Sequence, residues 1–284
     1  MHLPDYLKRG IIDTDKTKLV RSLLKQHCLH TICEAGKCPN KAECYAHNTA
    51  SFLIMGDICT RNCRYCNVKT GKPQILDKNE PEKLAETIKA LELKYAVITS
   101  VTRDDLPDGG AEHFAQTIKA VKKLDNSIKI EVLTPDFKGN LKSANIVLKA
   151  GPDVFNHNIE VVPSLYKQAR PQGSFERAIS LLKYAKENYP DIPIKTGMMI
   201  GLGETEEEIL DVLELLKSID CDIVTIGQYL QPTKNHLPVK KYYSPEEYEN
   251  LTKKAKDIGI KAPIFGPLVR SSYQADIALK NMKK

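Results

Sequence analysis

From about Ser51 onward, short apolar runs rich in β-branched residues alternate with amphipathic stretches of helical period. The alternation repeats in six units, whose apolar runs are SFLIMG, YAVITSV, IKIEVLT, DVFNHNIE, IPIKTGMMIG and DIVTIGQYL. Because strands joined through helices need right-handed crossovers, this series predicts a parallel sheet covered by helices. Such a sheet curls under its own twist, so we expect an α/β fold with a partial (β/α)6 TIM-type barrel.

Two parts of the chain do not follow this alternation. Residues 1–50 carry three closely spaced cysteines, and the stretch after Ile260, KAPIFGPLVRSSYQAD, is rich in proline and glycine. We interpret both as extensions of the barrel, since a chain of 284 residues suits one large core. The predicted division is an N-terminal extension at 1–50, a barrel at 51–261 and a C-terminal tail at 262–284.

Polar segments follow each of the predicted strands. Side chains at the C-terminal ends of parallel strands converge on one mouth, so we expect a shared active site there. The segments are GDICTRNC, SVTRDDLPDGG, LTPDFKG, HNIEVVPSLYKQARPQ, GLGET and QYLQPTKNHLP.

Composition excludes some classes of protein. No apolar run approaches the roughly 18 residues of a membrane span, and the N-terminus lacks the pattern of a secretion signal or transit peptide. We therefore expect a cytoplasmic protein without a membrane partner. The net charge of +6 is spread over lysine-rich helical faces, without an aromatic-rich RNA-binding motif. This pattern predicts no nucleic-acid partner and favours a solvated surface, with docking of an acidic partner as the alternative.

Cysteine is distributed very unevenly. Six of the eight cysteines fall between Cys33 and Cys66. In a chain without a secretion signal, such clustering favours metal or cluster ligands over disulfides. Cys28 and Cys221 lie outside both cluster spacings, and we assign them structural roles.

Cys59, Cys63 and Cys66 have the spacing CxxxCxxC in the segment CTRNCRYC. A structural zinc site normally has four ligands, whereas this loop supplies three thiolates and no fourth. A [4Fe–4S] cube takes one thiolate per iron, so three cysteines leave one iron open to a small-molecule ligand. The motif therefore favours an iron–sulfur cluster.

Placed after an apolar strand, CxxxCxxC resembles the signature of the radical S-adenosylmethionine (SAM) superfamily. Tyr65 stands at the aromatic position that this superfamily has before the last cysteine. The resemblance implies that SAM chelates the open iron of a cluster held by Cys59, Cys63 and Cys66. The reduced cluster would then cleave SAM to a 5'-deoxyadenosyl radical.

Cys33, Cys38 and Cys44 form a second trio in CEAGKCPNKAEC, which by itself indicates a second cluster only moderately. Together with MGDICTRNCRYCNV, SVTRDDLPDGGAEHF, FNHNIE and GPLVRSSYQAD, this motif resembles the lipoyl synthase family. The likeness runs in order from about residue 20 to about residue 280.

The resemblance implies an auxiliary [4Fe–4S] cluster on Cys33, Cys38 and Cys44, with Ser272 of RSSY as fourth ligand and Ser271 as the alternative. In the family, sulfides of this cluster are inserted at C6 and C8 of an octanoyl chain on a lysine of a carrier domain. Each insertion begins with removal of a hydrogen atom, so two SAM molecules and a reductant are consumed. A hard serine oxygen is a weaker iron ligand than thiolate, which suits a cluster that is dismantled.

The implied partners follow from this chemistry. They are an octanoylated lipoyl carrier domain of a 2-oxoacid dehydrogenase acyltransferase or of the glycine cleavage H protein, an electron donor such as flavodoxin or ferredoxin, and an iron–sulfur cluster carrier. We expect a monomer.

Five residues at predicted strand ends are candidate SAM contacts. The radical SAM resemblance implies that the loop with Thr102 and Asp104 contacts the SAM amino group. Asn158 and Glu160 are at positions suited to the ribose hydroxyls, and Arg170 suits the carboxylate. The alternative for Thr102 and Asp104 is an ordinary turn, and for Asn158 and Glu160 it is local hydrogen bonding within the loop. For Arg170 the alternative is a surface salt bridge. His113, His157 and His236 are assigned structural or surface roles, because hydrogen abstraction by a radical needs no protein base.

Two other functions fit parts of the pattern. One is a different two-cluster radical SAM sulfurtransferase, such as a tRNA methylthiotransferase or a biotin synthase-like protein. The other is a non-catalytic metal-binding or nucleic-acid-binding module with zinc on both trios.

Overall fold

The computed structural model describes residues 2–9, 14–46, 49–273, 275 and 279. The chain divides into two compact units. The first unit comprises residues 1–9, 63–66 and 156–284, and the second comprises residues 10–62 and 67–155.

The second unit contains strands in the order β1-β2-β5-β6-β7. Strands β2, β5 and β6 pair in parallel, and β1 pairs antiparallel with β2. A separate two-stranded parallel ladder joins β3 and β4. The elements are α1 (Asp15–Gln26), β1 (His30–Thr31), α2 (Ile32–Ala35), α3 (Lys41–Ala46), β2 (Ser51–Ile54), β3 (Ile58–Cys59), β4 (Lys69–Thr70), α4 (Glu80–Ala90), β5 (Tyr95–Ser100), α5 (Ala111–Leu124), β6 (Lys129–Leu133), the 3-10 helix η2 (Phe137–Gly139), α6 (Leu141–Lys149) and β7 (Val154–Asn156).

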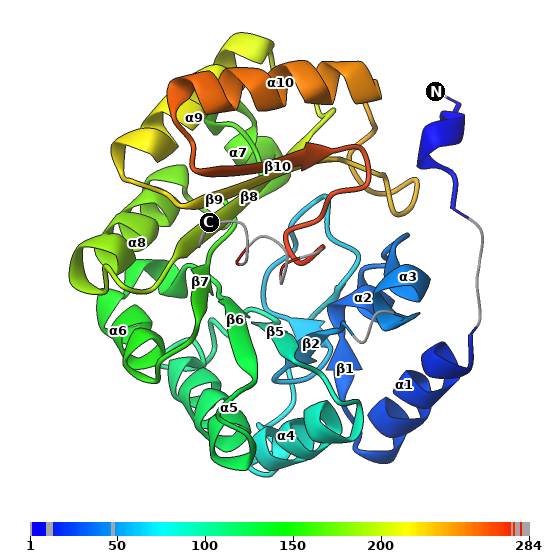
Figure 1. The fold of residues 1–284 in the computed structure, drawn as a ribbon, viewed down its shortest axis with the longest axis vertical. Helices are drawn as coiled ribbons and strands as arrows, with labels where there is room; N and C mark the ends of the chain where they lie inside the picture. The colour runs from blue at the N-terminus through cyan, green and yellow to red at the C-terminus, as the bar shows by residue number, and fades with distance from the viewer. Residues whose placement is uncertain (1, 10–13, 47–48, 274, 276–278, 280–284) are drawn as a thin grey trace. The chain divides into compact units, whose positions relative to one another are not determined.

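The strands of this unit are buried on both faces, which explains their nearly continuous apolar sequences. All residues of β2 and nearly all of β5 are buried, as is typical of parallel strands covered by helices. Helices α4, α5 and α6 lie along one face of this part of the sheet (Figure 1).

The first unit contains three parallel strands in the order β8-β9-β10. Helices α8, α9 and α10 lie on one face of them (Figure 1). Capping boxes begin α9 at Thr205 and α10 at Ser244, which explains why both helices start where they do. The elements are η1 (Asp5–Leu7), η3 (Pro163–Leu165), α7 (Tyr166–Ala169), α8 (Phe175–Asn188), β8 (Ile194–Ile200), α9 (Glu206–Ser218), β9 (Ile223–Gln228), α10 (Pro245–Ile258) and β10 (Ala262–Gly266).

The six predicted strands are present as β2 and β5 to β9, each followed by a helix. One of them is shorter than predicted. The run DVFNHNIE contributes only Val154–Asn156 to β7, and Glu160 at its end has a left-handed φ of +71°, which interrupts an extended chain.

Besides the short strands β1, β3 and β4, the described structure has a longer strand that the sequence did not indicate. Ala262–Gly266 form β10 and pair in parallel with β9, where the prediction has the start of a tail. Pro263 made this strand hard to recognise in the sequence, because proline lacks the N–H group that a sheet ladder needs. Proline is nevertheless tolerated on an edge strand. The predicted domain boundaries at residues 50 and 261 stay predictions.

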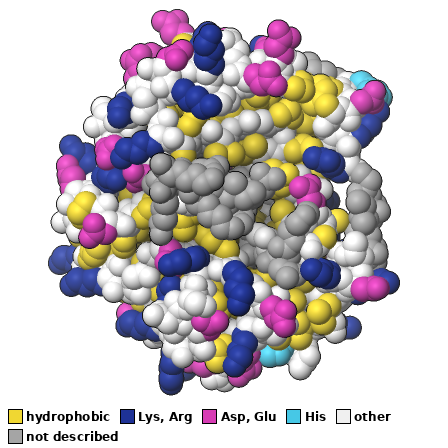
Figure 2. All heavy atoms as spheres, viewed as in Figure 1, with side chains coloured by type: hydrophobic (Ala, Val, Ile, Leu, Met, Phe, Trp, Pro, Cys, Tyr) yellow, Lys and Arg dark blue, Asp and Glu magenta, His cyan; other side chains and the backbone are white. Residues whose placement is uncertain are grey.

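Surface charge is mixed. On the face that Figure 2 shows, basic and acidic side chains are interspersed and form no single block. Within the described part of the chain, no helix is long and apolar enough to cross a membrane.

Candidate active site

The loop with the first cysteine trio leaves β2 through a sharp turn. Met55 and Gly56 have φ values of +68° and +93°, and the N–H of Met55 donates to the Glu80 carboxylate at 2.8 Å. The same carboxylate oxygen lies 2.6 Å from Nε2 of the buried His113. Gly110 has a φ of +88°, and a Cβ there would clash with the Met55 side chain, so this position favours glycine. Glu80, His113 and Gly110 thus fix the direction in which the loop starts.

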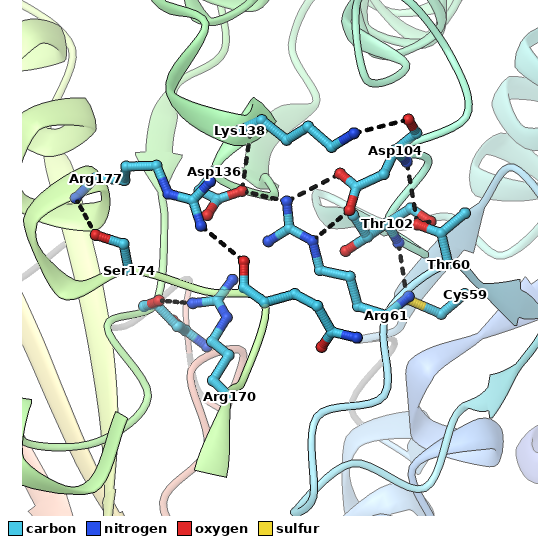
Figure 3. A network of polar contacts seen from close by, with 12 residues as sticks. Cys59, Thr60, Arg61, Thr102, Asp104, Asp136, Lys138, Arg170, Ser174 and Arg177 are labelled. Atoms are coloured by element: carbon cyan, nitrogen blue, oxygen red, sulfur yellow. Dashed lines mark hydrogen bonds and ion pairs between the residues drawn. The ribbon is translucent and has the colours of Figure 1, made fainter. Parts of the chain in front are cut away.

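Cys59 is the first cysteine of this loop, and its sulfur accepts two backbone hydrogen bonds. The donors are the N–H of Arg61 at 3.4 Å and the N–H of Thr102 at 3.3 Å. Thr60 strengthens the contact with the loop after β5, because its hydroxyl donates to the carbonyl of Thr102 and accepts from the N–H of Asp104 (Figure 3). N–H donors aimed at a sulfur ligand tune the potential of the cluster that it holds.

The structure gives Thr102 and Asp104 specific partners. Thr102 contacts the cysteine loop through its backbone, and the carboxylate of Asp104 accepts two hydrogen bonds from Arg61 at 2.7 and 2.9 Å. The role of both residues in binding SAM stays a prediction. The arginine partner is a feature that sequence reasoning missed, although Arg61 stands inside the CxxxCxxC motif.

Cys63 and Cys66 belong to the first unit, where backbone bonds hold their segment. The N–H of Cys66 donates to the carbonyl of Cys63 at 3.0 Å. Arg64 donates to the carbonyl of Ala169 at 2.8 Å and accepts from the N–H of Leu237 at 3.1 Å. The segment is therefore fastened to the end of α7 and to the loop that follows β9.

His236 adds a side-chain contact to this segment. Its Nε2 lies 2.9 Å from the carbonyl oxygen of Cys66, and its Nδ1 lies 2.9 Å from the hydroxyl of Thr233. Since a carbonyl only accepts, Nε2 carries the proton and Nδ1 accepts from Thr233. This is a structural role, as the sequence predicted. The only indication of this contact in the sequence was that His236 lies in a loop that follows a predicted strand.

Arg170 is buried, with 7% of its surface exposed, so the surface salt bridge considered as an alternative is not what the structure shows. Its Nη1 donates to the carbonyl of Asn158 at 3.2 Å and lies 3.4 Å from the hydroxyl of Tyr166. A Cβ at Gly173 would stand 2.6 Å from the Arg170 side chain. Glycine is thus needed for the arginine to pack in this place.

Asn158, Glu160 and Arg170 interact with one another. Burial raises the pKa of Glu160, an effect that the charge of Arg170 and a hydrogen bond from the Asn158 side chain only partly offset. A Cβ at Gly197 would stand 2.9 Å from Oδ1 of Asn158. The structure therefore brings the three predicted residues together, and the local hydrogen bonding considered for Asn158 and Glu160 is also present.

The second trio lies within the second unit. Cys33 is on α2, Cys44 is on α3, and the N–H of Cys38 between them donates to the carbonyl of Cys33 at 3.0 Å. Burial and the neighbouring Cys38 raise the pKa of Cys33 to about 11, against hydrogen bonds from Ser51. Burial and the other two thiols raise the pKa of Cys44 to about 12. The three thiols therefore lie close enough to influence one another electrostatically.

No disulfide joins any of the eight cysteines, all of which lie in the described ranges. Across those ranges, no three His, Cys, Asp or Glu side chains converge on the site of a single metal ion. A [4Fe–4S] cube has a different requirement, because each of its thiolates binds a separate iron.

Ser271 and Ser272 occupy the centre of a turn. The N–H of Tyr273 donates to the carbonyl of Arg270 at 2.9 Å, which closes the turn around the two serines. Both serines are half-buried. The turn follows Val269, whose carbonyl oxygen would lie 2.0 Å from a Cβ at Gly227.

Comparison with known proteins decides the family. The sequence profile of the radical SAM superfamily matches residues 53–216. The chain is 51% identical to the lipoyl synthase of Caldicellulosiruptor saccharolyticus, over 98% of this chain and 97% of that protein. The chain belongs to the lipoyl synthase family. A second lipoyl synthase, from Photorhabdus laumondii, is 49% identical over 98% of this chain and 87% of its own length.

Solved structures show the fold of this lipoyl synthase family member. Methylornithine synthase superimposes with a TM-score of 0.59 at 15% identity, over 96% of this chain and 81% of that one. The hydrogenase maturase HydG superimposes with a TM-score of 0.61 at 14% identity, over 95% of this chain and 61% of that one. The predicted α/β fold with a partial TIM-type barrel is confirmed.

Membership of the lipoyl synthase family makes the chain an enzyme of the radical SAM type and implies a [4Fe–4S] cluster and SAM. The first unit has atoms that fit SAM. Nε of Arg170 and Oδ1 of Asn158 are buried and have no hydrogen-bond partner among the described residues. A guanidinium donor suits a carboxylate, and an amide oxygen suits a hydroxyl. The residues present therefore fit the cofactor.

Proposed function

We propose that the enzyme inserts two sulfur atoms, at C6 and C8, into an octanoyl chain carried on a lysine of a carrier protein, and so forms lipoyl-lysine. The observation that carries this proposal is the pair of cysteine trios in one family member. One trio lies in the loop after β2, and the other is gathered by α2 and α3. Two trios could hold two separate clusters, one that binds SAM and one that supplies sulfur.

Cys59, Cys63 and Cys66 would hold the radical SAM cluster, and SAM would take the open iron. Thr102, Asp104, Asn158, Glu160 and Arg170 are the proposed SAM contacts. The two buried atoms without partners, on Arg170 and Asn158, support the last three most directly. Once bound, the cluster and SAM supply a radical that removes hydrogen atoms from unactivated carbon.

Cys33, Cys38 and Cys44 would hold the auxiliary cluster that donates sulfur, with Ser272 as fourth ligand and Ser271 as the alternative. The raised pKa values of Cys33 and Cys44 mean that their thiols are protonated at neutral pH in the metal-free protein. Binding of iron would displace these protons, so assembly of the cluster is coupled to proton release.

The chain's own groups bind and orient rather than transfer protons. Arg61 N–H and Thr102 N–H hold the Cys59 sulfur, and His236 holds the backbone at Cys66. Arg170 is buried, so little water would compete with SAM for its guanidinium group. No protein base is required, because the hydrogen leaves the substrate as an atom.

The proposed partners are an octanoylated carrier domain, of a 2-oxoacid dehydrogenase acyltransferase or of the glycine cleavage H protein, an electron donor such as flavodoxin or ferredoxin, and an iron–sulfur cluster carrier. We propose a monomer in the cytoplasm.

The test is an anaerobic reaction of the reconstituted enzyme with SAM, dithionite and an octanoyl-lysyl peptide, followed by mass spectrometry. We expect a peptide that has gained two sulfur atoms, together with 5'-deoxyadenosine, from a protein with about eight irons per chain. If 5'-deoxyadenosine forms and the peptide stays unchanged, the substrate assignment is wrong. Colourless protein that contains zinc would exclude the catalytic function altogether.

A further inference from the structure

Arg61 stands between Cys59 and Cys63 in the sequence, and its side chain is 2% exposed. Nε donates to one oxygen of Asp104 at 2.7 Å, and Nη2 donates to the other at 2.9 Å. Nη2 also donates to Oδ1 of Asp136 at 2.7 Å (Figure 3). One guanidinium therefore binds two carboxylates within the second unit.

The two carboxylates belong to different loops. Asp104 follows β5, and Asp136, which is almost fully buried, follows β6. Since Arg61 itself belongs to the loop after β2, its side chain joins the loops of three neighbouring strands. Sequence separations of 43 and 75 residues show that these contacts depend on the folded sheet.

The loop after β6 is strained, and it is held by the Asp136 carboxylate and the backbone carbonyl of Asp104. Phe137 and Lys138 have φ values of +46° and +54°, a left-handed conformation that is costly for residues other than glycine. Asp136 Oδ1 accepts from the N–H of Lys138 at 3.1 Å, and the Lys138 ammonium donates to the carbonyl of Asp104 at 3.1 Å. The charged group of Arg61 thus neutralises the acid that stabilises this conformation.

Such a buried ion network is poor as a purely stabilising device. Removing charges from water is costly, and an apolar replacement is often as stable. The guanidinium gives directional contacts that the ammonium group of lysine cannot reproduce. The network is therefore better explained by the accuracy with which it holds the loops than by fold stability.

The atoms that it holds include both donors to the Cys59 sulfur. One donor is the backbone N–H of Arg61, and the other is the N–H of Thr102, two residues before Asp104. Movement of the guanidinium relative to Asp104 would displace both. We propose that Arg61 is a positioning residue that sets the hydrogen bonds to Cys59 and, through them, the reduction potential of the cluster that Cys59 holds. The second part of this proposal, the effect on the reduction potential, rests on the proposed function. The first part, the effect on the hydrogen bonds to Cys59, does not.

The first part is tested by hydrogen exchange, read by mass spectrometry, on the metal-free full-length chain. In Arg61→Lys we expect amide exchange at Thr102 and Asp104 to be at least about tenfold faster than in the unchanged protein. The matched control is Arg103→Lys. Arg103 is also buried and pairs in a bidentate way, but with Asp105 only two residues away, so its pair joins no separate loops.

Equal exchange in Arg61→Lys and the unchanged protein would overturn the proposal, as would equal acceleration in the Arg103→Lys control. If Arg61→Lys does not fold, Asp104→Asn serves as the second variant. It keeps the shape of the side chain and removes one charged acceptor, so the same amides should exchange faster by a smaller factor.

The second part is tested on the anaerobically reconstituted enzyme. We expect the midpoint potential of the SAM-responsive cluster, followed by electron paramagnetic resonance, to shift in Arg61→Lys and to stay in place in Arg103→Lys. An unchanged potential with faster amide exchange would refute the effect on the cluster. If no SAM-responsive cluster forms even in the unchanged protein, the proposed function fails, whereas the exchange result still decides whether Arg61 positions the loops.

Discussion

The side-chain amide of Asn67 donates a hydrogen bond to the carbonyl oxygen of Ala35, 2.8 Å away. Asn67 directly follows Cys66, the last cysteine of the first trio, and Ala35 ends α2, the helix that carries Cys33. Within the second unit, the chain that leaves one cysteine motif is therefore fastened to the helix that begins the other. A short helix such as α2 has little stability of its own and depends on contacts of this kind.

We predict that Asn67→Leu weakens the binding of the auxiliary cluster that Cys33, Cys38 and Cys44 are proposed to hold. Loss of the amide leaves the last carbonyl of α2 unsatisfied, so Cys33 is held less firmly. Under a chelator, the variant should lose about half of its iron several times faster than the unchanged enzyme, while 5'-deoxyadenosine formation changes little. Asn188→Leu is the control, because the Asn188 amide also donates to a carbonyl at a helix end, at 2.9 Å from Tyr184. Equal iron loss in both variants would contradict the prediction.

Some elements were predictable from local pattern. The run around Phe52 and the run around Val97 are largely apolar, because both faces of these strands are covered. The strand at Pro263 was not predictable, since its place at a sheet edge is what makes proline acceptable. The left-handed turn at Met55 was not predictable either. It depends on contacts with Glu80 and Gly110, which are distant from Met55 in the sequence.

The candidate site likewise has features that the sequence predicted and features that it did not. Cysteine spacing indicated both trios, because metal ligation imposes a short-range pattern on the sequence. The pairing of Arg61 with Asp104 and Asp136 has no such pattern. Sequence placed each residue in a loop after a strand, but which carboxylate meets which cation depends on the order of the strands in space. The burial of Arg170 likewise depends on Gly173, which lets the side chain fold inward.

Substitutions in the two cysteine trios should have different effects on SAM cleavage and sulfur insertion. Cys59→Ala should abolish 5'-deoxyadenosine formation, because the radical SAM cluster is lost. Cys38→Ala should leave SAM cleavage measurable and abolish sulfur insertion, because the sulfur donor is lost. Both products are measured in one anaerobic reaction by mass spectrometry, and Cys221→Ala, outside both trios, is the control. Sulfur insertion by Cys38→Ala would refute the assignment of the donor.

Ser272→Ala and Ser271→Ala form a matched pair, because both serines lie at the centre of the same turn. We expect Ser272→Ala to lower sulfur insertion at least about tenfold and to make the auxiliary cluster less stable, whereas Ser271→Ala retains most activity. The readouts are two-sulfur product and iron content after gel filtration. The reverse order of effects would move the ligand to Ser271.

Asp153 should make stability depend on pH. Its carboxylate accepts from Lys122 at 2.7 Å and Lys129 at 2.8 Å. Burial alone would raise its pKa, but these hydrogen bonds and the N–H of Ile130 lower it below the ordinary value. A depressed pKa contributes stability above the unfolded pKa of about 3.9, and this contribution is lost as pH falls through the folded value.

Asp153→Asn should therefore lower the free energy of unfolding by about 1–3 kcal/mol at pH 7. The difference from the unchanged protein should shrink as pH falls below about 4. Urea denaturation at a series of pH values measures it. A difference that is the same at pH 7 and pH 3 would show that the charge of Asp153 is not responsible.

Gly227→Ala should displace the segment that carries the two serines. The added Cβ would stand 2.0 Å from the carbonyl oxygen of Val269, and real Cβ atoms essentially never approach this closely. Because Gly227 lies in a buried strand paired on both sides, the tail must move rather than the strand. We expect faster amide exchange at residues 267–273, a stability loss of about 1–3 kcal/mol, and a loss of sulfur insertion that exceeds the loss of SAM cleavage.

Gly71→Ala is the matched control, since its Cβ would meet Ile58 at an ordinary 3.4 Å. The control should leave exchange in the tail unchanged. If Gly227→Ala lowers SAM cleavage and sulfur insertion by the same factor, the strand itself has moved, and the tail is not the part that responds. If only sulfur insertion falls, the packing of Val269 on Gly227 is what holds the RSSY turn in its working position.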